Sequence, residues 1–434
     1  MADARTKRLT LVACVMGSAA VFLDGTVVNV ALPAIRADLD TGLAAQQWVV
    51  EAYLLTLGAL LMVGGSLGDL LGRRRIFVAG LAGFGVTSVI CALAPTAGLL
   101  IAARALQGVA GALLVPSSLA VITATFPDDE RGAAIGTWTG WAGIAMVVGP
   151  LGGGALIDAA SWRWIFAINV PLVLATLVLV RAAVLESVDE ESTGRIDYLG
   201  ALLCALGLAG PVFALIEQPL YGWSDPLVFL PGLAGIVLFA AFLVHERRSD
   251  HPMLPLEIFR ERNFAVGNAT TLALYGGLGA AMFFVAIFLQ QVAGYSAIAA
   301  GMTLMPITLI MFVMSRRFGA LSARIGPRAL MGAGPVVAGL GLLWMARLGT
   351  HVEYVTDLLP GVLVFGLGLS ATVAPLTSTV LGAVPRHHAG VASGANNAIS
   401  RVASLLAIAS VGAVVAAQFG AALDERLAGA PLSP

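Results

Sequence analysis

The chain has 434 residues, of which 59% are hydrophobic and 11% are charged, and its mean hydropathy is +0.92. Soluble globular proteins are about a quarter charged, so this composition excludes a soluble protein and predicts that most of the chain lies in lipid. The formal net charge is −1, and no basic stripe with interleaved aromatic residues indicates binding of nucleic acid.

The three cysteines lie in separate apolar segments, so their spacing predicts neither a disulfide framework nor a metal site. We expect no cofactor. No nucleophile–base spacing indicates an enzyme, and no loop is long enough to form the output domain of a membrane sensor.

Apolar segments long enough to cross a bilayer recur thirteen times. They cover residues 9–32, 46–68, 76–95, 99–124, 134–157, 163–184, 198–217, 226–244, 264–289, 299–320, 328–348, 355–381 and 389–418. The first exceeds the length of a signal peptide, so it is interpreted as a retained span. With the N-terminus inside, eighteen Lys and Arg residues lie on the inner side and four on the outer side. This bias predicts a multi-pass protein of the cell membrane with a cytoplasmic N-terminus.

An internal repeat is visible in two loops. GSLGDLLGRR at 65–74 and GALSARIGPR at 319–328 share their glycines and basic end at an offset of 254 residues. The offset divides the chain into a six-span bundle at 1–190, an inserted pair of spans at 191–250 and a C-terminal bundle at 251–434. Carrying the sixth span forward by 254 residues passes the end of the chain, so we expect the last span of the second half to be missing or cut short, with the C-terminus outside.

Asp24 is the only charged side chain between Leu9 and Leu32. A charged side chain at the centre of a bilayer costs roughly 2.5–3.5 kcal/mol on insertion scales. One interpretation is a proton or cation site facing a water-filled cavity, and the other is a polar group bonded to a neighbouring helix. Arg104 shares a helical face with Gln107, and at such depth it needs a partner or must snorkel to the interface.

Two glycine-rich segments are candidates for conformational control. In the first, Gly65, Asp69, Gly72, Arg73 and Arg74 predict either a latch between conformations or an ordinary positive inner loop. In the second, Gly149 and Pro150 lie in a glycine-dense fifth span, where a hinge and close helix packing are both open.

Candidate substrate-binding groups are polar and aromatic side chains at membrane depth. They are Asn29, Glu51, Tyr53, Gln107, Trp138, Trp141, Tyr275, Phe284, Gln290 and Asn397. Glu51 either shares cation recognition with Asp24 or reaches the water boundary on the outer side of the membrane without a role. Trp138 and Trp141 either stack on an aromatic or cationic ligand or serve in packing.

In chain order, LDGTVVNVALP at 23–33, GSLGDLLGRR at 65–74, RALQG at 104–108, GPLGG at 149–153 and WRWIFAINVP at 162–171 resemble the fourteen-span drug/proton antiporters of the major facilitator superfamily. The resemblance implies an all-α integral membrane fold of two six-helix bundles with a two-helix insert. It implies proton coupling through Asp24, a proton relay through Arg104, an antiport role for Gly149-Pro150 and a locking role for Asp69.

We therefore expect a proton-coupled antiporter that exports small hydrophobic or cationic molecules, such as drugs or antibiotics, from the cytoplasm. Its partners would be the substrate, protons and the lipid bilayer, and we expect a monomer. The alternative is a dedicated exporter of one endogenous metabolite.

Overall fold

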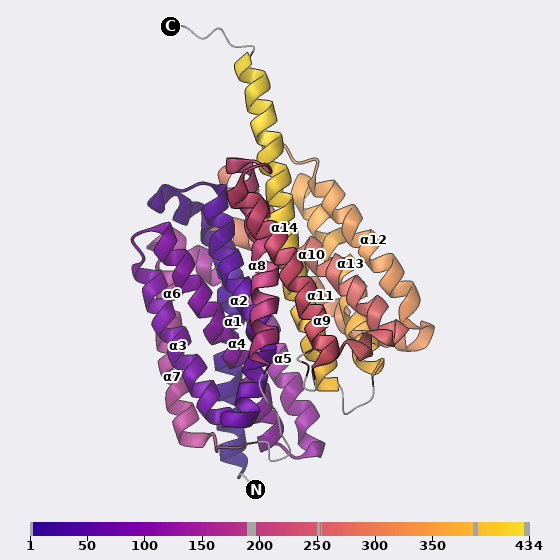
Figure 1. Cartoon of the computed structure of the whole chain (residues 1–434). Helices are drawn as coiled ribbons and strands as arrows, with labels where there is room; N and C mark the ends of the chain where they lie inside the picture. The colour runs from indigo at the N-terminus through magenta and orange to yellow at the C-terminus, as the bar shows by residue number, and fades with distance from the viewer. Residues whose placement is uncertain (1–2, 189–196, 250–251, 253, 385–388, 429–434) are drawn as a thin grey trace.

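The computed structural model describes residues 3–188, 197–249, 252, 254–384 and 389–428. The expected domain boundaries at 190/191 and 250/251 fall outside these residues. Two helical bundles stand side by side, with the N-terminus at one end of the long axis and the C-terminus at the other (Figure 1). The first bundle contains α1 (Ala4–Leu39), α2 (Leu43–Leu71), α3 (Arg73–Leu93), α4 (Ala97–Thr125), α5 (Asp128–Ala159), α6 (Trp164–Ala167) and α7 (Asn169–Ala183).

The rest of the chain forms an insert and a second bundle. The insert is α8 (Tyr198–Tyr221) and α9 (Pro226–Arg248). The second bundle is η1 (Leu256–Arg260), α10 (Arg262–Gln291), α11 (Ala297–Ile325), α12 (Pro327–Met345), η2 (Tyr354–Leu358), α13 (Leu359–Gly382) and α14 (Ala389–Ala428). Among the described residues, twelve helical segments are long and apolar enough to cross a membrane. They match every expected span except the fifth, which is the 32-residue helix α5.

Local sequence explains where these helices begin and end. Side chains of Asp3, Thr96, Asp197, Asp225 and Ser296 accept hydrogen bonds from the first-turn amides of α1, α4, α8, α9 and α11. Gly72 ends α2 at a φ of 110°, and Gly326 ends α11 at a φ of 83°. These two glycines stand at equivalent positions of the repeat, so the offset of 254 residues read from the loops also relates the helix ends.

We call the side at which α1 begins the inner side and the opposite side the outer side. The first bundle packs α1 against α4, α5 and α7, and α4 also packs against α2 and α3. The second bundle packs α13 against α11 and α12, and α10 against α14. The larger apolar core lies in the first bundle and continues through Phe283, Leu405 and Ile408 into α10 and α14.

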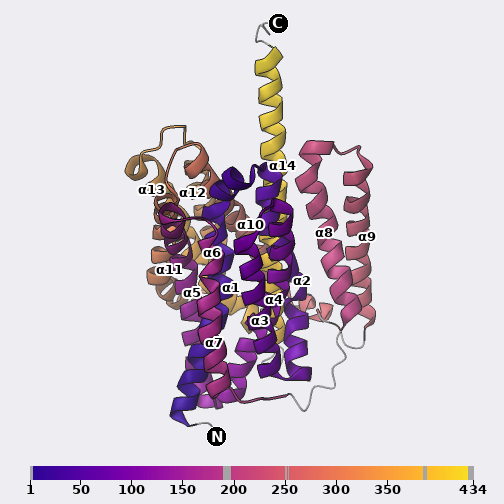
Figure 2. The ribbon, with the colours of Figure 1, turned by 90° about the vertical axis from the view of Figure 1, so that its left-hand side faces the viewer.

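The insert joins the two bundles on one side. Figure 2 shows the α8–α9 hairpin beside α2 and α14, with α9 on its far side. Helix α8 packs against both α2 and α14. The indole of Trp48 on α2 donates a hydrogen bond of 2.8 Å to Glu217 on α8. The apolar side chains of α9 are widely exposed, as expected for a surface in contact with lipid.

Glycines let α2 and α4 approach closely. A methyl group on Gly64 would lie 2.0 Å from the carbonyl oxygen of Ala112, and one on Gly108 would lie 2.4 Å from the carbonyl oxygen of Tyr53. Neither position has room for a side chain. This contact holds α4, which carries Arg104, at a fixed depth against α2.

We expect Gly64→Ala to lower the free energy of unfolding by about 1–3 kcal/mol, because the added methyl group forces the two backbones apart. The measurement is thermal unfolding of the purified protein in detergent. Gly136→Ala is the matched control, since no heavy atom lies within 4 Å of its added methyl group. Equal melting temperatures for the two variants would contradict this account of the α2–α4 contact.

Candidate functional site

Asp24 lies inside the first bundle, where three side chains surround its carboxylate. The Arg104 guanidinium forms an ion pair with Oδ2. The side-chain amides of Gln107 and Asn169 donate to Oδ1 over 3.1 and 3.2 Å. Asp24 is 0% exposed and Arg104 is 1% exposed. The carboxylate therefore receives its stabilisation from α4 and α7, and none from solvent in this conformation.

This arrangement differs from the expected water-facing acid. Asp24 has the surroundings expected of a polar group bonded to neighbouring helices, because Arg104, Gln107 and Asn169 supply the donors that water would otherwise provide. Arg104 is paired at depth and does not snorkel. The role of this buried pair remains a prediction.

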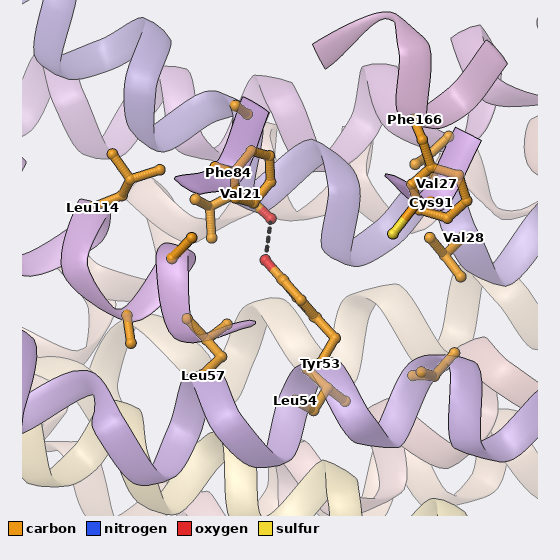
Figure 3. Packing of buried hydrophobic residues seen from close by; sticks show 14 of the residues in the cluster. Val21, Val27, Val28, Tyr53, Leu54, Leu57, Phe84, Cys91, Leu114 and Phe166 are labelled. Atoms are coloured by element: carbon orange, nitrogen blue, oxygen red, sulfur yellow. Dashed lines mark hydrogen bonds between the residues drawn. The ribbon is translucent and has the colours of Figure 1, made fainter. Parts of the chain in front are cut away.

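The Arg104 guanidinium is held from every side. Its Nε donates to the carbonyl of Val49 over 3.0 Å, and Nη1 donates to Gln107 Oε1 over 2.6 Å. Its Cζ lies 4.1 Å from the centre of the Tyr53 ring and 5.7 Å from that of Phe166. Such contacts stabilise a cation away from water. Figure 3 shows the Tyr53 hydroxyl directed at the Val21 carbonyl, with which it forms a hydrogen bond of 3.0 Å.

Two residues of this cluster were not among the predicted site residues. Ser88 on α3 contacts the amides of Gln107 and Asn169, at 3.0 and 3.4 Å. Asn169 lay within a recognised motif, which could have drawn attention to it, but Ser88 carried no sequence signal. Gln107 and Tyr53 also lie in this buried cluster, and their predicted role in substrate binding stays a prediction. We call the cluster the Asp24–Arg104 network: Asp24, Tyr53, Ser88, Arg104, Gln107 and Asn169.

The two tryptophans of α5 do not act as one stacking pair. Trp138 donates to Ser18 Oγ over 3.0 Å, and its ring meets Phe22 edge-on with centroids 6.0 Å apart. Trp141 is 51% exposed. Trp138 thus packs α5 against α1, and only Trp141 presents its ring away from this contact.

Other predicted substrate residues lie where the two bundles meet. Gln290 on α10 donates to the carbonyl of Val30 on α1 over 3.0 Å. Asn29, next to Val30, has a buried Oδ1 without a hydrogen-bond partner. Phe284 packs edge-on against Phe283, with centroids 4.8 Å apart, and joins the core of the first bundle. These residues therefore lie at the contact between α1 and α10.

Tyr275 and Asn397 belong to the second bundle. The carbonyl of Tyr275 on α10 accepts from Ser404 on α14 over 3.0 Å, and its phenol lies within electrostatic reach of Arg401. Asn397 lies on the exposed side of α14. Glu51 on α2 is fully buried, and within the described part of the chain neither carboxyl oxygen has a hydrogen-bond partner.

The inner loop after α2 forms a charged contact with the end of α7. Arg73 pairs with Asp69 at 2.9 Å. The backbone amide of Arg74 donates to Glu186 over 3.0 Å, so this carboxylate lies at the positive N-terminal end of α3. Gly72 faces Glu186, and a methyl group there would lie 2.6 Å from the carboxylate. Glu186 was not predicted, since sequence alone does not place it beside this loop.

Gly65, also predicted in this loop segment, packs against α4. A methyl group on Gly65 would lie 3.5 Å from Pro116. Its position is therefore an ordinary helix contact. The latch role proposed for the loop stays a prediction.

Gly149 and Pro150 lie in the outer half of α5, between both bundles. A methyl group on Gly149 would lie 2.4 Å from Thr26 Oγ1, and one on Gly301 of α11 would lie 2.7 Å from the carbonyl oxygen of Pro150. Close packing across the two bundles is thus present at this motif. Whether it also serves as a hinge stays a prediction.

The described hydrogen bonds between the two bundles come from the outer halves of the helices. Asp158 at the end of α5 accepts from the amides of Ala297 and Ile298, at 3.2 and 3.0 Å. Arg36 donates to Gln291 over 2.9 Å. We call this group of contacts, together with Gln290–Val30 and Gln47–Ile408, the outer interface. The bundles are therefore closed together on the outer side.

Two bundles related by an internal repeat, with ionisable groups buried at membrane depth, define a secondary transporter. The family model of the Major Facilitator Superfamily matches residues 14–408. The chain belongs to this superfamily and is a multi-pass membrane protein.

Among its relatives, multidrug resistance protein Stp of Mycobacterium tuberculosis is 36% identical over 424 residues, covering 98% of this chain and 78% of the relative. The tetracenomycin C resistance and export protein of Streptomyces glaucescens is 34% identical over 430 residues, again covering 98% and 78%. The puromycin resistance protein of Streptomyces alboniger is 36% identical over 405 residues, covering 91% and 79%.

Solved structures share the fold at low sequence identity. A peptide transporter of the POT family in complex with sulfate superposes with a TM-score of 0.69 at 16% identity, covering 94% of this chain and 88% of that chain. A bacterial homologue of the lysosomal transporter Spinster, described as inward-facing and unoccupied, gives a TM-score of 0.65 at 18% identity, covering 98% and 85%.

The buried pair predicts non-additive losses of stability. Asp24→Asn or Arg104→Gln alone should cost about 3–5 kcal/mol, because each leaves the other charge buried and unpaired. The double variant should lose less than the sum of the two by about 0.5–3 kcal/mol. The measurement is a double-mutant cycle, in which the free energy of unfolding in detergent is compared for the wild type, the two single variants and the double variant. Additive losses would mean that the two groups do not interact as the structure places them.

We expect the two hydrogen bonds that Asp158 accepts to help keep the outer interface closed. Asp158→Ala removes two charge-assisted hydrogen bonds, each of about 1.5–3 kcal/mol. We expect Val30→Cys to react at least about tenfold faster with an impermeant maleimide from the outer side in this background, since 1.4 kcal/mol corresponds to tenfold. Asp225→Ala, which removes the cap of α9, is the control. An unchanged reaction rate after Asp158→Ala would show that these bonds do not hold the interface.

Proposed function

We propose that this protein is a proton-coupled antiporter that exports small hydrophobic or cationic molecules from the cytoplasm. The observation that carries the proposal is the Asp24–Arg104 network, a charged pair buried in lipid-embedded helices whose hydrogen bonds go to other side chains and to the Val49 carbonyl. Membrane-embedded ionisable groups mark ion and proton pathways. The names of relatives as drug-resistance and export proteins support the direction and the class of substrate.

In this mechanism a proton and the Arg104 guanidinium compete for the Asp24 carboxylate. Deprotonated Asp24 pairs with Arg104, as in the described conformation. Protonation removes the negative charge, weakens its bonds to Gln107 and Asn169, and frees Arg104 to interact elsewhere. Since the network links α1, α3, α4 and α7, a change at the carboxylate alters how these helices pack.

Substrate binding is proposed at the junction of the two bundles, where Asn29, Trp141, Tyr275, Gln290 and Asn397 contribute polar and aromatic groups. Transport follows from opening the outer interface and closing the inner side around this junction. The inner side is assigned to the cytoplasm from the Lys and Arg bias. Asp69 and Arg73 are proposed to hold the inner loop in one conformation.

The charge of the substrate decides the driving force. Exchange of one proton for one monovalent cation moves no net charge, so the pH gradient alone drives it. Export of a neutral molecule also responds to the membrane potential, at about 2.3 kcal/mol per charge per 100 mV. The protein is proposed to work as a monomer in the cell membrane.

A second candidate function is export of one metabolite made by the same cell. The relative from Streptomyces glaucescens, named for resistance to and export of tetracenomycin C, favours this alternative. Competition for transport among structurally unrelated dyes separates the two functions: mutual competition indicates broad export, and no uptake of any dye indicates a dedicated exporter.

The test of coupling uses everted membrane vesicles with an acidic interior. We expect the wild type to accumulate ethidium, and collapse of the pH gradient by nigericin to abolish accumulation. Asp24→Asn should reduce it to the level of vesicles without the protein, because the network can no longer exchange a proton. Asp40→Asn is the control, since Asp40 lies at the outer end of α1 with a φ of 48°, which asparagine tolerates. Gradient-driven accumulation by Asp24→Asn at the wild-type rate would overturn the proposed role of Asp24.

A further inference from the structure

Glu51 is a buried acid that the Asp24–Arg104 network does not use. Its residue is 0% exposed, and both carboxyl oxygens lack a hydrogen-bond partner among the residues that the structure describes. A carboxylate without a partner costs several kcal/mol to bury, even after relaxation of its surroundings. The neutral, protonated form does not carry this cost. This burial without partners favours a proton on Glu51 in the described conformation.

The position of Glu51 connects it to the outer interface. Gln47, one turn earlier in α2, donates to the carbonyl of Ile408 on α14 over 3.1 Å. Gly58, two turns later, faces α14 as well, since a methyl group there would lie 3.3 Å from Arg401 Cβ. Residues 47, 51 and 58 share one face of a helix. Glu51 thus lies on the face of α2 that closes against α14.

The surrounding charges do not neutralise Glu51. Arg401 on α14 lies beside Gly58, about two helical turns further toward the inner side. Arg104 on α4 is paired with Asp24 on α1, and Glu217 on α8 accepts the indole of Trp48. The phenol of Tyr53 on α2 donates to the Val21 carbonyl, and Tyr275 lies on α10 within electrostatic reach of Arg401.

We propose that Glu51 is a second proton-binding site and that closing the outer interface requires a proton there. The proposal rests on the alternating-access transport proposed above. When the bundles separate on the outer side, the Gln47–Ile408 bond breaks and the face of α2 that carries Glu51 meets external water. There the carboxylate is solvated and stable. Closure returns it to a site without donors, so closure binds one proton.

The sign of the pH dependence follows from this linkage. The closed state binds one more proton than the open state, so low external pH favours closure and rising pH favours opening. For one proton, the ratio of closed to open molecules changes by at most about tenfold per pH unit. A proton that binds from the outside thereby drives closure of the outer interface, the step after which the substrate site can open to the cytoplasm again.

The experiment measures the outer distance directly, without transport. Spin labels at Ala37→Cys on α1 and Val292→Cys after α10, in a Cys204→Ala background, report the separation by pulsed dipolar spectroscopy in nanodiscs. We expect the short-distance fraction of the wild type to fall as the pH rises from about 5 to about 9, a range that covers the titration of buried glutamates. Glu51→Gln should remain at the short distance throughout, because its side chain cannot lose a proton.

A matched variant separates Glu51 from another acid. Glu217→Gln removes a membrane-embedded acid from α8 and should keep the wild-type profile. Loss of the profile in Glu217→Gln with retention in Glu51→Gln would overturn the proposal. A flat wild-type profile would overturn it too. Failure of ethidium transport with an intact profile would overturn the proposed function and leave this inference standing.

A second variant, Gln47→Glu, should gain pH dependence, so the proposal can be tested even if the Glu51→Gln protein does not fold. In Gln47→Glu, a protonated carboxyl group can still donate to the Ile408 carbonyl, but a carboxylate cannot. Closure of this variant should bind two protons, and the closed-to-open ratio should change by up to about 100-fold per pH unit. A Gln47→Glu profile no steeper than the wild type would show that this face of α2 does not couple protons to closure.

Discussion

The ion pair between Asp24 and Arg104 is the interaction on which the first bundle depends. In lipid, neither charge can be left alone, so each determines the position of the other and of the helix that carries it. The close glycine contact between α2 and α4 sets the depth of Arg104, while Gln107 and Asn169 complete the carboxylate. Packing and electrostatics therefore specify the same arrangement of α1, α4 and α7.

The second bundle lacks this constraint although it repeats the same architecture. At the offset of 254 residues, Asp24, Ser88 and Arg104 correspond to Leu278, Leu342 and Leu358. Leu358 belongs to the apolar core of the second bundle, and Leu278 and Leu342 pack against that core. The repeat thus has one half organised by a buried charge pair and one half organised by apolar packing.

Sequence alone predicted the helices and the repeat because both are recorded locally, in apolar length and in the glycines at helix ends. It also singled out Asp24 and Arg104 individually, because charged side chains are rare in lipid. It did not predict the donors Ser88 and Asn169 or the contacts of Glu186 and Asp158. These depend on how helices distant in sequence rotate against one another, which no local pattern encodes. For the same reason the sequence did not predict that Gln107, a substrate-binding candidate, contacts Asp24 in this conformation.

The insert has a mechanical consequence. Helix α8 touches α2 of one bundle and α14 of the other, so a rotation of the bundles cannot preserve both contacts. The Trp48–Glu217 bond fixes α8 to α2 in surroundings with little competing water, which leaves the α14 surface as the one that slides. In the alternating-access cycle proposed above, the hairpin would travel with the first bundle. Lipids along α9 would keep their neighbours, and those at the seam between α8 and α14 would rearrange at every turnover.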